Sequence, residues 1–254
     1  MGGFFYNLGR SFRPSVQKLN LALCTLTGDE EGALASEYEL GREMATEIGR
    51  AMVKSEDQWL RQSTDSVTDL LASSIKDSAY RFHVEILIDD APTAFVVPGG
   101  FIFVSTGLLE LCHHDRDEVA SVIGHEMGHV LHKHAIEKLA LETIDRLRFG
   151  TAFSGGGAAG KLRKIGLGII RQSFSQECEL EADAFSVRLC RAAGFDPEGS
   201  QRLIRRLGAL RSEGQSTLLD QYLSTHPPLE LRLRNIQQVL SSDSFGEAGF
   251  QQIE

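Results

Sequence analysis

Hydrophobic residues along the chain follow two different periods, which separate helical from extended regions. Segments 29–50 and 56–76 place apolar residues at helical spacing among many charged ones, and this predicts two surface helices. From residue 82 to 88 every second residue is apolar, a pattern that predicts a half-buried strand. Two helices are therefore expected to precede the main sheet.

Two more strands are expected directly after the first one. Residues 93–97 and 101–105 are largely apolar, and Pro98-Gly99-Gly100 between them has the composition of a tight turn. The two strands and the turn between them predict a hairpin. All expected strands thus lie between residues 82 and 105, with helices on both sides.

Helical spacing returns in the second half of the chain. Asp115 and Glu118 have the spacing of a capping box, and the apolar pattern that follows predicts one helix to about Leu147. Beyond the glycine-rich stretch 150–168, serine, glycine and proline signals predict three more helices: from Ser173 or Ser175 to Gly194, from Asp196-Pro197, and from Pro227-Pro228 through Leu240. The whole pattern predicts an α+β fold that is mainly helical, with residues 1–28 as an N-terminal segment and 29–254 as one domain.

Composition and charge narrow the class of protein. The 254 residues are 42% hydrophobic and 24% charged, as in globular chains and unlike disordered or fibrous ones. Acidic residues outnumber basic ones by 35 to 26 and no basic stripe is visible, so no nucleic-acid partner is expected. The cysteines are far apart, and neither a secretion signal nor a membrane-spanning stretch can be drawn. We therefore expect a cytoplasmic protein, or one that contacts a membrane peripherally.

The segment His125-Glu126-Met127-Gly128-His129 is an H-E-x-x-H motif within the long expected helix. Histidines four residues apart lie on one helical face, so both imidazoles can bind a single metal ion. Glu126 points away from that axis but can still reach an attacking water. His132 and His134 follow on the same helix, and we expect supporting or surface roles for them, because a fourth ligand would close the site.

A catalytic zinc site needs a third protein ligand from elsewhere in the fold. Glu179-Leu180-Glu181-Ala182-Asp183, on the next expected helix, offers Glu179 as that ligand. Asp183, one turn later on the same face, could accept a hydrogen bond from the second nitrogen of a zinc-binding imidazole. Glu181 is expected to be a surface charge.

Further motifs accompany H-E-x-x-H in a fixed order. They are Thr93-Ala94-Phe95 through Pro98-Gly99-Gly100 with Gly107-Leu108-Leu109, then Gly124 to Val130, then Glu179 to Asp183, and last Ser224-Thr225-His226-Pro227-Pro228 with Arg232. Over about residues 80–240 the chain thereby resembles the gluzincin-type zinc endopeptidases, which include the CAAX prenyl protease and the bacterial protease HtpX. The resemblance implies a zincin-like metallopeptidase domain that binds one Zn²⁺ per chain and cleaves polypeptides.

The resemblance also implies individual roles. His125, His129 and Glu179 correspond to the zinc ligands and Glu126 to the catalytic base, so that the expected activity is metalloendopeptidase activity. His226 corresponds to the residue that stabilises the oxyanion, and Arg232 to one that supports that loop. Apart from the resemblance, Tyr222 is a weaker candidate for the oxyanion role. Members of the prenyl-protease and HtpX type have transmembrane helices, and this chain resembles a soluble or peripheral relative.

An extended peptide substrate could pair with a strand at the edge of the sheet. Either 93–97 or 101–105 could supply that edge, and we expect Ala94, Phe95, Gly99 and Gly100 to contribute. Two other functions stay open: a catalytically silent, zinc-stabilised binding or chaperone-like module, and hydrolysis of a small peptide or another amide. The residues do not predict an oligomeric state.

Overall fold

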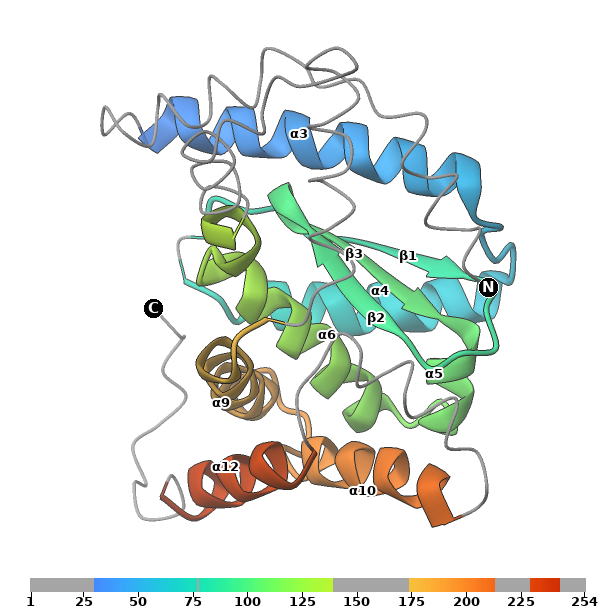
Figure 1. Ribbon diagram of the computed structural model, residues 1–254, viewed down its shortest axis with the longest axis vertical. Helices are drawn as coiled ribbons and strands as arrows, with labels where there is room; N and C mark the ends of the chain where they lie inside the picture. The colour runs from blue at the N-terminus through green and yellow to red at the C-terminus, as the bar shows by residue number, and fades with distance from the viewer. Residues whose placement is uncertain (1–29, 77, 139–173, 213–228, 243–254) are drawn as a thin grey trace, which may run out of the picture.

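The computed structural model describes residues 30–76, 78–138, 174–212 and 229–242. Its elements follow in this order: α3 (Glu30–Ala51), α4 (Gln58–Ser73), β1 (His83–Leu87), β2 (Ala94–Val97), the 3-10 turn η1 (Pro98–Gly100), β3 (Phe101–Ser105), α5 (Thr106–Leu111), α6 (Arg116–Leu131), α9 (Gln176–Ala192), α10 (Gly199–Ser212) and α12 (Leu229–Ser242). Helices surround one small sheet (Figure 1). The mainly helical α+β fold expected from the sequence is confirmed.

The sheet has the strand order β1-β3-β2, so β3 is central and β1 and β2 are its edges. β2 and β3 are antiparallel and form the expected hairpin. Gly99 and Gly100 at its turn have φ angles of 78° and 87°, in the left-handed region that glycine adopts most easily. β1 runs parallel to β3, a pairing that the local pattern did not predict.

Each face of the sheet contributes to a separate hydrophobic core, because successive side chains of a strand point to opposite faces. Helix α3 covers one face (Figure 1), where its buried residues pack on β1, β2 and β3: Leu40, Met44 and Ile48 against Leu87, Val97 and Phe103. The other face belongs to the larger core, which includes Ile86, Val96, Ile102 and Val104 together with α4, α6, α9, α10 and α12. The layers therefore run from α3 through the sheet to α6 and the later helices.

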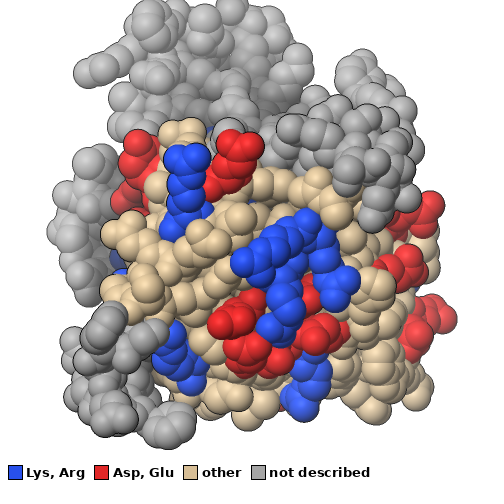
Figure 2. Space-filling model, turned by 90° about the horizontal axis from the view of Figure 1, so that it is seen from below, with Lys and Arg blue, Asp and Glu red and all other residues tan. Residues whose placement is uncertain are grey.

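Helix α6 lies inside the larger core, and all its residues from Glu118 to Val130 are buried. Asp115 caps it by accepting hydrogen bonds from two backbone N–H groups. Glu118 does not complete the expected capping box: its carboxylate turns to Arg206 of α10, 2.9 Å away. Arg202 of α10 also pairs with Asp196 at 2.6 Å. Figure 2 shows acidic and basic side chains close together on the face seen from below.

Helix α6 ends earlier than expected. Leu131 is its last residue, and Lys133 adopts a φ of 58°, after which a new helical turn covers residues 134–138. The expectation of one continuous helix to about Leu147 is therefore wrong at Lys133. Other boundaries agree with the sequence, since Ser175 caps α9 and Gly194 follows its end with a φ of 81°.

None of the described helices has both the length and the apolar character that a membrane span requires. The proposed boundary after residue 28 falls just before the first described residue and stays a prediction. The glycine-rich stretch 150–168 also lies outside the described residues.

Candidate metal centre

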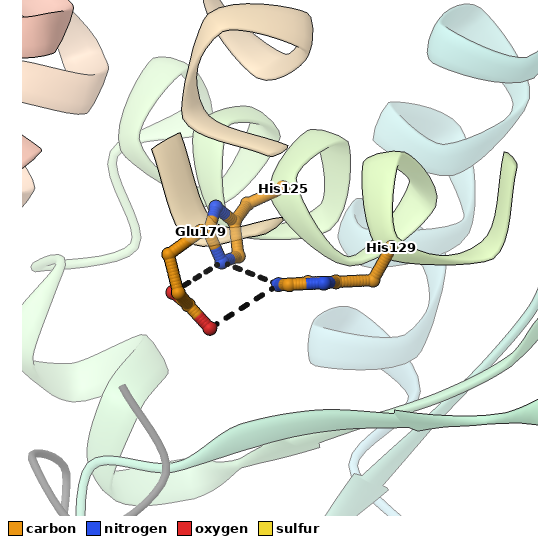
Figure 3. A group of neighbouring side chains, drawn as sticks. All are labelled: His125, His129 and Glu179. Carbon is orange, nitrogen blue, oxygen red and sulfur yellow. Dashed lines mark hydrogen bonds and ion pairs between the residues drawn. The ribbon is translucent and has the colours of Figure 1, made fainter. Parts of the chain in front are cut away.

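Three side chains from two helices, α6 and α9, point toward one another (Figure 3). His125 and His129 project from α6 one turn apart, and Glu179 faces them from the first turn of α9. The imidazoles share a face because they are four residues apart. The structure thus brings together the three residues that the sequence analysis expected to be metal ligands.

The ligand atoms of this group form a compact triangle. His125 Nε2 lies 3.1 Å from His129 Nε2 and 3.3 Å from Glu179 Oε2, and Glu179 Oε1 lies 3.5 Å from His129 Nε2. A tetrahedral zinc with ligands at about 2.1 Å separates them by about 3.4 Å. The side chains are at most 7% exposed. The donor set therefore fits one transition-metal ion, held out of bulk solvent.

Asp183 and Arg232 orient the first imidazole. His125 Nδ1 lies 2.9 Å from Asp183 Oδ1, while Arg232 holds both oxygens of Asp183 at 2.7 and 2.9 Å. Arg232 Nη2 is also 3.2 Å from His125 Nδ1, but a guanidinium only donates, so both groups donate to Asp183. His125 Nε2 then keeps its lone pair for a metal.

The electrostatics of the group favour a positive charge at its centre. Burial and the charge of Arg232 would lower the pKa of His125, but hydrogen bonds to Asp183 and Glu179 outweigh them and raise that pKa to about 9. For Asp183, burial would raise the pKa, but Arg232 and His125 more than offset it, so its pKa is below the ordinary value. The Asp183 carboxylate therefore remains ionised beside His125.

Two glycines let α9 approach α6 closely enough for Glu179 to reach the imidazoles. A Cβ at Gly128 would lie 3.1 Å from the Ala182 Cα, and one at Gly124 would lie 3.0 Å from the Ser186 Oγ. Ser186 also donates a hydrogen bond of 2.8 Å to the Ser121 carbonyl across the same contact. Gly124 and Gly128 are one helical turn apart, so both lie on the face of α6 that packs against α9.

A second chain of contacts, which the sequence analysis did not anticipate, begins at the other imidazole. His129 Nδ1 lies 2.9 Å from His134 Nδ1, and His134 Nε2 lies 3.2 Å from Glu181 Oε2. On a continuous helix His134 would point away from His129, but the left-handed Lys133 turns the chain back. Glu181, expected to be a surface charge, is half exposed yet contacts both His134 and His132. Burial lowers the pKa of His134, although Glu181 opposes this.

The expected catalytic base lies beside a cavity. Glu126 is 2% exposed and lines this cavity together with His125, Arg232 and Ala94 of the edge strand β2. Of the two strands that could supply an edge, only β2 does so, because β3 is central. A peptide that approaches β2 would therefore be near Glu126.

The other expected site residues have different outcomes. Phe95 lies on β2 but stacks on Phe103 at 5.1 Å, on the face covered by α3. Gly99 and Gly100 are buried, and Gly99 packs against the Tyr38 backbone, so their placement gives no support for substrate binding. His226 and Tyr222 lie outside the described residues.

A His-His-Glu metal group on two packed helices, with an acidic residue next to the first histidine, is the arrangement of the gluzincin class of metallopeptidases. The sequence comparisons agree with that class. Residues 54–240 match Peptidase family M48. The chain belongs to this family. The prenyl protease named in the resemblance is a narrower assignment than this match supports.

Curated relatives are similar over much of the chain. It is 31% identical to the mitochondrial metalloendopeptidase OMA1 of Schizosaccharomyces pombe over 78% of its own length and 58% of that protein. It is 32% identical to the metalloprotease LoiP of Escherichia coli over 70% of its length and 69% of LoiP. With the beta-barrel assembly-enhancing protease of Escherichia coli it shares 24% identity over 79% of its length and 43% of that protein. The chain therefore spans little more than half of the first relative.

Proposed function

We propose that this protein is a zinc-dependent endopeptidase that cleaves polypeptides. The observation that supports this most is the convergence of His125, His129 and Glu179 into one buried triangle of ligand atoms. Membership of Peptidase family M48 gives the reaction class. Zinc is favoured over magnesium or calcium because two imidazoles and one carboxylate suit a borderline-soft ion, whereas the other two prefer oxygen ligands.

The metal, when bound, would polarise the scissile carbonyl as a Lewis acid. Glu126, from its place beside His125 at the cavity, would take a proton from the attacking water and deliver it to the departing amine. Asp183 and Arg232 would hold His125 in the tautomer that leaves Nε2 free. We retain His226 as the proposed donor to the developing oxyanion, on the resemblance alone.

Substrate binding is proposed at the β2 edge. Ala94 lines the cavity next to Glu126, and backbone groups of an edge strand can pair with an extended peptide whatever its sequence. Such pairing would make cleavage tolerant of side-chain identity. The cytoplasmic location stays a prediction, since the OMA1 relatives are named as mitochondrial proteins.

The test of this function separates metal binding from catalysis. In Glu126→Gln we expect one bound zinc per chain by elemental analysis, but cleavage of unfolded casein and of a quenched peptide at least about a hundredfold slower, because general-base catalysis contributes about that factor or more. The matched control is Glu110→Gln, an exposed residue of α5. Wild-type cleavage should stop with a chelator and return with zinc.

Two results would contradict the proposal. Full activity in Glu126→Gln would reject the assigned base. Wild-type protein that holds one zinc yet cleaves neither substrate would point to a silent, metal-stabilised module instead.

A further inference from the structure

A second set of metal-ligating atoms lies beside the first. His132 Nε2 is 3.7 Å from Glu181 Oε1, and His134 Nε2 is 3.2 Å from Glu181 Oε2. One ligand atom from each of the three residues lies within 4.8 Å of the others, and the two imidazole rings stack with centroids 5.4 Å apart. The two distances to Glu181 are close to those from Glu179 to His125 and His129.

The exposure of this outer group differs from that of the inner group. The side chain of His134 is 3% exposed, that of His132 is 31% and that of Glu181 is 55%. One ligand is therefore fixed in the protein while the other two face solvent, so an ion can enter and leave without unfolding. We propose that His132, His134 and Glu181 form a second, weaker site for a zinc-like divalent cation. Two imidazoles and one carboxylate again suit zinc or cobalt.

The outer site is linked to the inner one by the hydrogen bond between His129 and His134. A neutral imidazole has one N–H and one lone pair. When His129 binds the inner cation through Nε2, its hydrogen is on Nδ1 and is donated to His134 Nδ1, 2.9 Å away. His134 then carries its own hydrogen on Nε2, directed at Glu181. The inner ion thus favours the tautomer of His134 that cannot bind the outer ion.

An outer cation requires the opposite tautomer. His134 must offer the lone pair of Nε2, which moves its hydrogen to Nδ1, and two N–H groups then face each other across 2.9 Å. Each ion therefore weakens the binding of the other, and this coupling is reciprocal. Excess metal at the outer site would lower the activity by releasing the inner ion, which gives the enzyme a built-in response to metal concentration. This consequence rests on the proposed metal centre, whereas the outer site can be tested by itself.

The first measurement is stoichiometry by equilibrium dialysis of the full chain against Co²⁺. We expect two ions per wild-type chain and one in His132→Ala and in Glu181→Gln. Glu177→Gln, an exposed acid one turn earlier on α9, and His113→Asn, an exposed histidine, are matched controls that should retain two.

The outcomes separate the two sites. One ion in the wild type and still one in His132→Ala would overturn the outer site and leave the inner one intact. No bound ion in the wild type would overturn the metal centre itself. A control variant that lost an ion like His132→Ala would also overturn the assignment, because the second ion would then lie elsewhere.

The second measurement tests the coupling. In the double variant His125→Gln, Glu179→Gln the inner site is removed while the pair of His129 and His134 remains. We expect its single Co²⁺ to bind at least about tenfold more tightly than the second ion of the wild type, a difference of about 1.4 kcal/mol. Equal dissociation constants would overturn the coupling. The absorption spectrum of Co²⁺ at the inner site gives a parallel test. Further Co²⁺ should leave this spectrum unchanged in His132→Ala, which lacks the outer site, but should change it in the wild type.

Discussion

Glu37 holds the β2–β3 turn against helix α3. Its buried carboxylate accepts a hydrogen bond of 3.0 Å from the Gly99 N–H and one of 2.9 Å from the Tyr80 hydroxyl. Burial raises the pKa of Glu37, and the two hydrogen bonds and Lys133 offset this only in part. A carboxyl group whose pKa is higher in the folded state stabilises that state most when protonated. The contribution is complete below the ordinary glutamate pKa and is lost as the pH rises through the raised one.

The variant Glu37→Gln should therefore be more stable than its parent at pH 7.5, with a smaller difference at pH 4.5. The amide keeps an acceptor for Gly99 and has no charge to desolvate, and we expect a gain of about 1 kcal/mol at the higher pH. Urea unfolding in the Glu126→Gln background, which avoids self-cleavage, measures it. Glu37→Ala loses both acceptors and should cost about 2 kcal/mol. An equal change in stability by Glu37→Gln at pH 7.5 and at pH 4.5 would contradict the raised pKa of Glu37.

At the scale of helices, the metal group depends on how closely α9 packs on α6. Glu179 reaches the imidazoles because Gly128 presents no side chain to Ala182. Gly128→Val should overpack this contact, costing about 1–3 kcal/mol, and should move Glu179 away from His129. We expect metal affinity to fall at least about tenfold in a competition assay with a chromogenic chelator.

Gly208→Val is the matched control for that variant. Gly208 lies in α10, and a Cβ there would meet nothing nearer than the Leu229 Cδ1 at 4.0 Å. The same substitution in a helix should therefore leave metal affinity unchanged. Similar losses in both variants would show that helix propensity, and not the spacing of α6 and α9, explains the effect.

The sequence predicts only part of the metal group and its surroundings. His125 and His129 could be paired from sequence because a spacing of four fixes their common face. Glu179 could be added because the chemistry of zinc requires a third ligand. The contact of His134 with His129 could not be found, because it depends on the left-handed conformation of Lys133, and lysine gives no local signal for such a turn. The partnership of Glu181 with His134 depends on that same turn.

The arrangement of the whole molecule explains why the remaining features escaped prediction. The pairing of β1 with β3, the burial of Gly99 under α3 and the cavity beside Glu126 all join segments that are distant in sequence. The hydrophobic pattern specifies which face of an element is buried but not which element covers it. The hairpin and the ends of α9 have local turn and capping signals and could be predicted directly, whereas the early end of α6 at Leu131 could not.

The same arrangement predicts how the protein responds to loss of its metal. The inner ligands join α6 to α9, but both helices also share the larger hydrophobic core with the sheet, α10 and α12. A chelator should therefore lower the stability without unfolding the chain, by about 4 kcal/mol if free zinc had been about a thousandfold above its dissociation constant. Thermal unfolding followed by circular dichroism, with and without chelator, measures the shift. In Glu179→Gln, which lacks one metal ligand, the chelator should lower the unfolding temperature far less. Unfolding of the wild type at room temperature on chelation would show instead that the metal, and not the core, holds α9 in place.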